Sequence, residues 1–207
     1  MLEPNRIMLG EPAIKALQQP MWQLRTKFSA SADAAKSLLF TGLSGGEGAS
    51  TLAMALATGV AIFDLIRVLL IDADFASRSL TLSGNLGDAD GLRDWQPGQP
   101  LPVQPLRLAS GVDLLPSGRS TQTSMAKLVA SGRIEALTKA ASEAYELVVW
   151  DAPPLMTKPE TRMLVPCVDG VVLVVLSGRS LIDELIKATD EIAAVNGRLA
   201  GVVRNRA

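Results

Sequence analysis

Residues 41–51 read TGLSGGEGAST and decide which fold the chain can adopt. An apolar run at residues 36–40 precedes this glycine-rich stretch, and alanines and leucines at helical spacing follow it at residues 50–62. The pattern predicts a buried strand, a tight turn and a helix. In such a turn the backbone N–H groups point inward at an anion, with the positive end of the helix dipole behind them.

The turn departs twice from the strict phosphate-loop pattern G-x-x-x-x-G-K-[ST]. Leu43 stands where the first glycine belongs, and Ala49 stands where the lysine belongs. Ser50 and Thr51 keep the hydroxyl groups that meet Mg²⁺ and a phosphate. A strand-to-helix turn also needs glycines when nothing binds, so this segment alone leaves a purely structural interpretation open.

Two further apolar segments end in carboxylates. Residues 67–74 read RVLLIDAD, and residues 146–154 read ELVVWDAPP. Because loops at the carboxyl ends of parallel strands converge on a ligand, these ends and the glycine-rich turn predict one metal–nucleotide site. We expect Asp151 to hold Mg²⁺ through water, and Asp74 to act near the γ-phosphate. The alternative is that Asp72 and Asp74 cap the next helix and that Asp151 opens a proline turn.

The composition suits a soluble globular chain. Of 207 residues, 48% are hydrophobic and 20% are charged, and the net charge is −1. Lysines and arginines are scattered, so we expect no nucleic-acid partner. Histidine, the usual general base, is absent, and the single Cys167 cannot form an internal disulfide, which fits a cytoplasmic setting. The longest apolar run, residues 171–176, is too short to span a bilayer, so membrane contact is expected only through a partner.

Strands alternate with helices along the chain, which predicts an α/β fold with a doubly wound, mostly parallel sheet flanked by helices. We expect an N-terminal arm at residues 1–19 and a single domain at residues 20–207. Residues 80–110, rich in Gly, Pro, Asn and Asp, are predicted to be loop. Further strands are expected at residues 111–116, 169–176 and 199–203, and further helices at residues 125–145, 160–165 and 181–195.

The order of these motifs resembles the cytoplasmic domain of bacterial tyrosine kinases of the capsular and exopolysaccharide type. The resemblance covers nearly the whole chain from Gln19 onward and includes GVDLLPSG, CVDGVVLVVLSG and GVVRN besides the motifs above. The wider group includes partition and division-site ATPases, which share the sheet and the D-x-P-P turn. The resemblance implies a regulator of polysaccharide polymerisation or export. It would work with a membrane-embedded chain-length or export protein at the inner face of the plasma membrane, as a homo- or hetero-oligomer.

The resemblance also implies ATP or ADP with Mg²⁺ as cofactors. Asp72 and Asp74 correspond to the family's second acidic motif and Asp151 to its Walker B aspartate, and these three are the candidate catalytic residues. Asn205 corresponds to the asparagine that contacts the adenine; its alternative is a polar residue near a frayed terminus. The nucleotide-binding loop falls on Gly45, Gly46, Glu47, Gly48, Ala49, Ser50 and Thr51, and the metal ligands on Ser50 and Asp151.

Departures from the family pattern concern the loop lysine, the segment after Asp74, the oligomerising pattern and the tyrosine-rich tail. Phe75-Ala76-Ser77 follows Asp74 where an arginine-rich continuation is expected. The family's oligomerising pattern E-x-x-R-x-x-R becomes Gln19, Trp22 and Arg25. The sequence ends at Ala207 without the tyrosine-rich tail that such kinases phosphorylate, and the one tyrosine, Tyr145, is expected to pack at a helix end.

The missing lysine weakens both binding and chemistry. Its charge-assisted hydrogen bonds are worth about 1.5–3 kcal/mol each, so its loss lowers nucleotide affinity roughly ten- to a hundredfold. Phosphoryl transfer suffers more, because it depends on positioning and on neutralising developing charge. Arg78 or a partner's arginine is a possible replacement. We therefore predict a degenerate kinase that binds nucleotide weakly and serves as a regulatory or scaffolding subunit.

Two alternatives remain open at this point. One is a positioning ATPase of the partition, division-site or pilus-localisation type. Its active members carry a second lysine where this chain has Ser44, and no amphipathic membrane helix follows Asn205. The other is an active autokinase that uses a displaced lysine, either Lys36 or the better-placed Lys158 beside the D-x-P-P turn.

Overall fold

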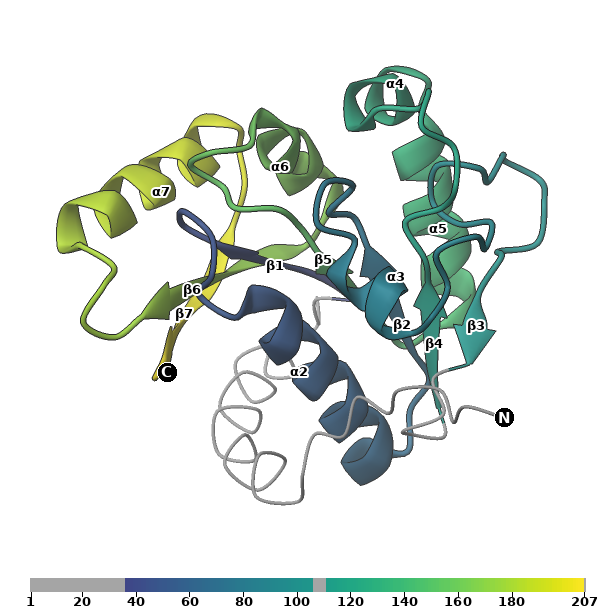
Figure 1. Ribbon diagram of the computed structural model, residues 1–207, viewed down its shortest axis with the longest axis horizontal. Helices are drawn as coiled ribbons and strands as arrows, with labels where there is room; N and C mark the ends of the chain where they lie inside the picture. Colours follow the sequence, from purple (N-terminus) through teal and green to yellow (C-terminus); the bar gives the residue numbers. More distant parts are fainter. Residues whose placement is uncertain (1–35, 106–110, 207) are drawn as a thin grey trace.

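The computed structural model describes residues 36–105 and 111–206, which form a seven-stranded sheet between two layers of helices (Figure 1). The strand order is β3-β4-β2-β5-β1-β6-β7, and every neighbouring pair is parallel except β3 and β4. The predicted α/β class is confirmed. The strands are β1 (Ser37–Gly42), β2 (Val68–Asp72), β3 (Gln104–Pro105), β4 (Val112–Leu115), β5 (Leu147–Asp151), β6 (Gly170–Leu176) and β7 (Leu199–Asn205). The helices are α2 (Ala49–Asp64), α3 (Ser79–Ser83), α4 (Met125–Ala130), α5 (Arg133–Ala144), α6 (Pro159–Leu164) and α7 (Ile182–Ala194), with a 3₁₀ turn η1 (Val165–Cys167).

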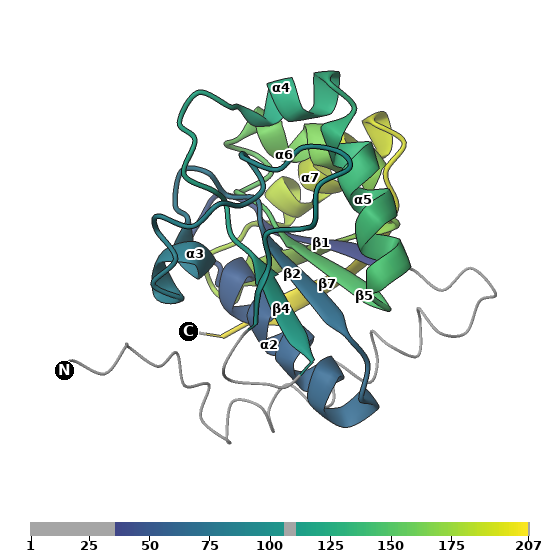
Figure 2. The same cartoon turned by 90° about the vertical axis from the view of Figure 1, so that its right-hand side faces the viewer.

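The central strands are buried on both faces because successive side chains alternate between two cores. Leu39, Ile71 and Trp150 face the layer of α4 to α7. Phe40 and Leu70 face the opposite layer, which α2 and α3 form. Figure 2 shows these two helix layers on either side of the sheet. The continuous apolar runs in the sequence therefore reflect burial on both faces.

The chain order creates one crevice at the carboxyl edge of the sheet. β1 lies between β5 and β6, so the chain crosses over β5 to reach β2 and later returns to β5. In open α/β sheets, ligands bind outside the carboxyl ends of the strands at such a reversal. Phe40 of β1 and Asp72 of β2 both pair in register with Asp151 of β5. The turn after β1 and the acidic strand ends therefore meet at this crevice.

The prediction that residues 80–110 are loop is wrong at both ends of the segment. The segment begins within α3, which starts at Ser79, and it contains the edge strand β3. Tertiary contacts create both elements: the Asp72 carboxylate accepts hydrogen bonds from Thr81, and β3 pairs with β4 through Gln104 and Leu114. Neither contact can be inferred from the secondary-structure propensities of the residues in this segment. The expected arm at residues 1–19 and the residues Gln19, Trp22 and Arg25 lie outside the described residues.

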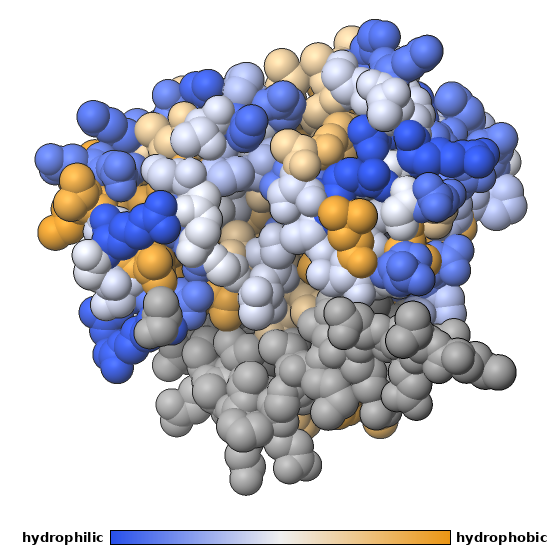
Figure 3. Space-filling view, in the orientation of Figure 1, coloured by the Kyte–Doolittle hydropathy of each residue, from blue (hydrophilic) through white to orange (hydrophobic). Residues whose placement is uncertain are grey.

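The surface of the described part is mostly hydrophilic, with separate apolar groups. None of the described helices is both long and apolar enough to cross a membrane. Exposed apolar side chains occur at the start of α7, where Ile182 and Ile186 are 76% and 52% exposed. Helix α7 lies on the left in Figure 1, and on that side Figure 3 shows apolar residues beside strongly hydrophilic ones.

Tyr145 lies in the core, which agrees with the expected packing role. It is 6% exposed, and its hydroxyl donates a hydrogen bond to Asp113 Oδ2 over 2.7 Å. The Arg67 guanidinium lies 4.8 Å from the ring centroid. Burial and the neighbouring Asp113 raise the pKa of Tyr145 to about 12. A kinase has no access to this hydroxyl in the folded chain.

Tyr145→Phe is expected to lower the free energy of unfolding by about 1.5–3 kcal/mol, the range for a hydrogen bond to a charged group. The phenylalanine ring keeps the packing but leaves the Asp113 carboxylate without its donor. Urea unfolding followed by circular dichroism measures the change. A variant as stable as the wild type would contradict this role for the hydroxyl.

Candidate nucleotide-binding site

The turn between β1 and α2 presents an uninterrupted row of free backbone donors. Among the described residues, none accepts a hydrogen bond from the N–H groups of residues 46–51. Gly46 and Gly48 have φ of 82° and 85°, in the left-handed region that glycine adopts without strain. Successive N–H groups in such a turn make a concave anion site, and the start of α2 adds the positive end of its dipole. The predicted loop residues therefore form one cradle.

Glu47 braces this cradle from behind. Glu47 is only 3% exposed, and its carboxylate accepts hydrogen bonds from the N–H groups of Ser44 (2.9 Å) and Gly45 (2.8 Å). A Cβ atom on Gly42 would lie 2.2 Å from Glu47 Oε2, so any side chain at position 42 would displace the Glu47 carboxylate. Asn205 donates from Nδ2 to the Glu47 carbonyl over 2.9 Å. The last strand is thereby tied to the loop, while the adenine contact of Asn205 stays a prediction.

Glu47→Ala is expected to destabilise the protein by about 1.5–3 kcal/mol, because the backbone N–H groups of Ser44 and Gly45 lose a charged acceptor in partly buried hydrogen bonds. Glu47→Gln is the matched control, since its amide oxygen still accepts from the Ser44 or Gly45 N–H and the volume is kept. Thermal unfolding of both variants measures the difference. Equal stability of the alanine variant and the wild type would show that the carboxylate does not hold the loop.

The D-x-P-P turn after β5 packs against the same loop. Thr41 Oγ1 donates to the Pro153 carbonyl over 2.7 Å, and Leu155 N–H donates to the Gly42 carbonyl over 2.9 Å. Met156 N–H donates to the Leu43 carbonyl over 3.0 Å. These bonds fix the Asp151 backbone relative to the cradle. The two motifs, distant in sequence, thus form one rigid unit.

Asp151 is buried without a partner. It is 0% exposed, and neither carboxylate oxygen accepts a hydrogen bond of normal geometry from the described residues. Burial raises the pKa of Asp151 well above its ordinary value; the nearby Ser50 hydroxyl opposes this shift, and Asp72 and Asp74 add to it. An unpaired carboxylate at a crevice costs stability and points to a missing positive group.

A magnesium ion with nucleotide phosphates fits this arrangement. Asp151 and Ser50 offer the oxygen ligands that Mg²⁺ prefers, and Mg²⁺ usually binds through few protein ligands together with water and phosphate oxygens. Among the residues that the structure describes, no group of three or more Asp, Glu, Cys or His side chains is arranged to hold a metal ion by itself. The side chains suit a metal that arrives with its nucleotide.

Asp72 and Asp74 have different environments. Asp72 is 0% exposed, and its Oδ2 accepts from the N–H and hydroxyl of Thr81 over 2.8 and 2.7 Å. Burial raises the pKa of Asp72, and the hydrogen bonds from Thr81 oppose that rise. Asp74 is partly exposed, and its Oδ1 accepts from the N–H groups of Ala76 and Ser77. Asp72 thus bonds to the first turn of α3, as the structural alternative predicts, whereas Asp74 bonds to the turn that precedes this helix. Catalytic roles for both residues stay predictions.

The positive side chains considered in the sequence do not all reach the cradle. Lys36 precedes β1 and so lies at the amino edge of the sheet, opposite the crevice. Arg78 donates from Nε to Ser117 Oγ and from Nη2 to the Gly87 carbonyl. These hydrogen bonds hold its guanidinium away from the phosphate cradle. Lys158 is exposed after the D-x-P-P turn, just before α6. Sequence reasoning missed Arg179, whose Nη1 lies 3.1 Å from where a Cβ of Gly46 would be.

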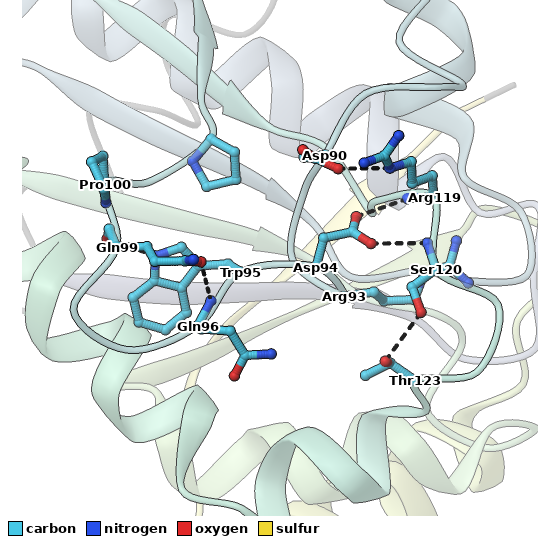
Figure 4. A pocket seen from close by; sticks show the side chains of 11 residues that line it. Asp90, Arg93, Asp94, Trp95, Gln96, Gln99, Pro100, Arg119, Ser120 and Thr123 are labelled. Carbon is cyan, nitrogen blue, oxygen red and sulfur yellow. Dashed lines mark hydrogen bonds and ion pairs between the residues drawn. The ribbon is translucent and has the colours of Figure 1, made fainter.

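A separate hollow of about 600 Å³ lies between the segment at residues 90–102 and the turn after β4 (Figure 4). Its acidic groups are already paired: Asp90 binds Arg119, and Asp94 accepts from the N–H groups of Arg119 and Ser120. No residue of the phosphate cradle lines this hollow. Its polar contacts join two loops and are not part of the candidate site.

Comparisons with known proteins agree with the fold and the motifs. The family model described as cellulose biosynthesis protein BcsQ matches residues 35–181. Tyrosine-protein kinase YwqD of Bacillus subtilis is 30% identical over 209 residues, which cover 99% of this chain and 86% of that protein. The kinase domain of Escherichia coli tyrosine kinase ETK superposes with a TM-score of 0.81 at 22% identity, covering 94% of this chain and 74% of that one.

A complex of Cyanothece McdA with ATP superposes with a TM-score of 0.64 at 23% identity, covering 82% of this chain and 69% of that one. At this identity the likeness concerns the fold. The BcsQ family model matches most of the chain, and YwqD is similar over 99% of it, so these two matches establish the family. The chain therefore belongs to the family of phosphate-loop proteins that contains BcsQ and the bacterial tyrosine kinases, as its motifs predict.

Proposed function

We propose that this protein binds ATP or ADP at the cradle, transfers phosphate poorly or not at all, and regulates or scaffolds polysaccharide polymerisation and export. The observation that carries the proposal is the pairing of free backbone donors at residues 46–51 with the unpartnered Asp151. Anionic phosphates and a metal ion would satisfy both at once. Every helix start leaves N–H groups that water satisfies, whereas a buried carboxylate without a partner is unusual, so Asp151 is what separates this site from a purely structural turn.

Asp151 and Ser50 would hold Mg²⁺, which would supply charge neutralisation at the phosphates when bound. This chain's own part is to hold those phosphates with the backbone N–H groups of residues 46–51 and to place the Asp151 carboxylate beside them. Ala49 contributes a backbone N–H but no charge. Ground-state binding is therefore kept in weakened form, whereas the charge that develops in phosphoryl transfer lacks its usual partner.

Loss of autophosphorylation follows from the position of the tyrosine as well. Tyr145 is buried and hydrogen-bonded to Asp113, and it is the only tyrosine in the sequence. An active kinase that uses Lys158 would have to phosphorylate another protein. Lys158→Ala tests that alternative, because a loss of ATP binding in this variant alone would favour a displaced lysine.

The link to polysaccharides rests on relatives. The matching family model carries the name of a cellulose biosynthesis protein, and the curated relatives are named tyrosine-protein kinases. By resemblance to that group, the proposed partner is a membrane-embedded chain-length or export protein, and the proposed location is the inner face of the plasma membrane. Oligomerisation with that partner or with further copies belongs to the same proposal.

Two experiments test the proposed function. Purified protein incubated with labelled ATP and Mg²⁺ should bind nucleotide and yield no phosphotyrosine on itself or on an added tyrosine-containing peptide. A tagged copy recovered from detergent-solubilised membranes should bring down a polysaccharide chain-length or export protein. Robust phosphorylation would overturn the degenerate reading, and recovery of chromosome-bound or pilus proteins instead would favour a positioning ATPase.

A further inference from the structure

Arg179 stands in the turn that follows β6, and this turn lies beside the cradle. β6 pairs with β1 up to Gly42 and Val174, so β6 ends close to the point where the glycine-rich loop begins. The N–H groups of Arg179 and Ser180 both donate to the Leu176 carbonyl, over 3.1 and 3.0 Å. Ser180 Oγ in turn accepts from the Leu176 N–H over 2.9 Å. The turn is held by its own backbone and does not need the arginine side chain.

The Arg179 side chain extends from this turn to the loop. Its Nη1 lies 3.1 Å from the position that a Cβ of Gly46 would occupy, which places the guanidinium against the backbone of residue 46. Residue 46 is where the row of free N–H donors begins. A side chain at that position would crowd the guanidinium, which would have to move by a few tenths of an ångström. The glycine thus leaves room both for the turn and for the arginine.

The guanidinium is uncommitted. Arg179 is exposed, and among the residues that the structure describes none accepts a hydrogen bond or forms an ion pair with its side chain. Arg78 differs in this respect, since Ser117 and the Gly87 carbonyl occupy its donors. A charged, unpaired group that rests on an anion cradle is available to an incoming anion.

We propose that Arg179 supplies the positive charge that Ala49 cannot, by binding the β- and γ-phosphates of a nucleotide held in the cradle. This inference rests on the proposed nucleotide binding and deepens it. A guanidinium is suited to the task because it stays charged at all physiological pH values and offers paired donors that match phosphate oxygens. An arginine supplied by the same chain is a known way to stabilise charge on a transferring phosphoryl group. In this chain it supplies part of the ground-state binding that the loop lysine would otherwise give.

Arg179→Ala is expected to weaken ATP and ADP binding about ten- to a hundredfold, the loss of one or two charge-assisted hydrogen bonds. Isothermal titration in the presence of Mg²⁺ measures it. Arg179→Gln should lose nearly as much, because it keeps length but not charge, and Arg179→Lys should recover part of the affinity. The melting temperature of unliganded Arg179→Ala should match the wild type, because the side chain has no partner to lose.

Lys158→Ala is the matched control, an exposed cation beside the neighbouring turn. Its affinity should stay at the wild-type value; an equal loss would mean that general surface charge is responsible and would overturn the inference. Adding Ala49→Lys to Arg179→Ala should restore binding, and by more than the same lysine adds to the wild type. If the wild-type protein binds neither ATP nor ADP, the proposed function itself is contradicted. If the wild type binds nucleotide and Arg179→Ala binds it with the same affinity, only the role of Arg179 is contradicted.

Discussion

Asp151→Asn is expected to stabilise the unliganded protein while abolishing Mg²⁺-dependent nucleotide binding. Both carboxylate oxygens of Asp151 are buried without a hydrogen-bond partner, and a neutral amide of nearly the same shape costs less to bury than a charged carboxylate. The same change removes the proposed ligand of the metal. Thermal unfolding with and without ATP and Mg²⁺ should show a higher melting temperature that ligand no longer raises.

The pH dependence of stability provides the control for this prediction. Burial raises the pKa of Asp151 in the folded state, so the folded state binds a proton more tightly than the unfolded chain does. Stability contributed by that proton is full below the unfolded pKa of about 3.9 and is lost as pH rises through the raised folded value. Asp151→Asn should remove this part of the decline. Burial also raises the pKa of Asp72, so the variant should still lose some stability as pH rises, though less than the wild type.

An asparagine variant that is less stable than the wild type at pH 8 would contradict this account, because it would show that Asp151 stabilises the empty fold. Unchanged binding of ATP with Mg²⁺ would contradict the metal role separately. The two outcomes are independent, so the structural and functional parts of the prediction are tested apart.

Ala49→Lys is expected to tighten ATP and ADP binding about ten- to a hundredfold, because it restores charge-assisted hydrogen bonds worth about 1.5–3 kcal/mol each. Ala49 is the first residue of α2 and lies within the row of free N–H donors. A lysine there extends from a cradle whose backbone is already in place. Titration calorimetry of the variant and the wild type under identical salt conditions measures the gain.

Ala49→Met is the matched control, since methionine adds similar length and no charge. It should leave affinity unchanged or lower it slightly. Equal affinities for Ala49→Lys and the wild type would contradict the view that the loop is a phosphate site lacking only its lysine. Phosphotyrosine should remain absent in Ala49→Lys alone, because Tyr145 stays buried.

The sequence predicted the sheet and most of its elements because the buried strands carry continuous apolar runs and the helices carry clear periodicity. It failed for α3 and β3, which depend on contacts made at a distance. α3 is held by the bonds from Thr81 to Asp72, and β3 by pairing with β4. Short elements of this kind have too little local signal to be recognised in advance.

The gathering of the candidate residues at one edge of the sheet was predictable from the sequence, but the contacts among them were not. Gly46, Ser50 and Asp151 follow from motifs and from the rule that carboxyl ends converge. The inward turn of Glu47 depends on side-chain geometry that no motif encodes. Arg179 lies far from the loop in sequence and reaches it only because β6 is the neighbour of β1. A search for cations on strands adjacent to the loop would have found it once the strand order was known.

The most direct measurement is calorimetric titration of the wild-type protein with ATP and ADP, each with and without Mg²⁺. We predict saturable binding of both nucleotides that strengthens with Mg²⁺ and is about ten- to a hundredfold weaker than in the Ala49→Lys variant. No phosphorylated product should accumulate during the titration. Absence of binding under every condition, or tight binding accompanied by rapid turnover, would contradict a phosphate cradle that has kept its shape and lost its lysine.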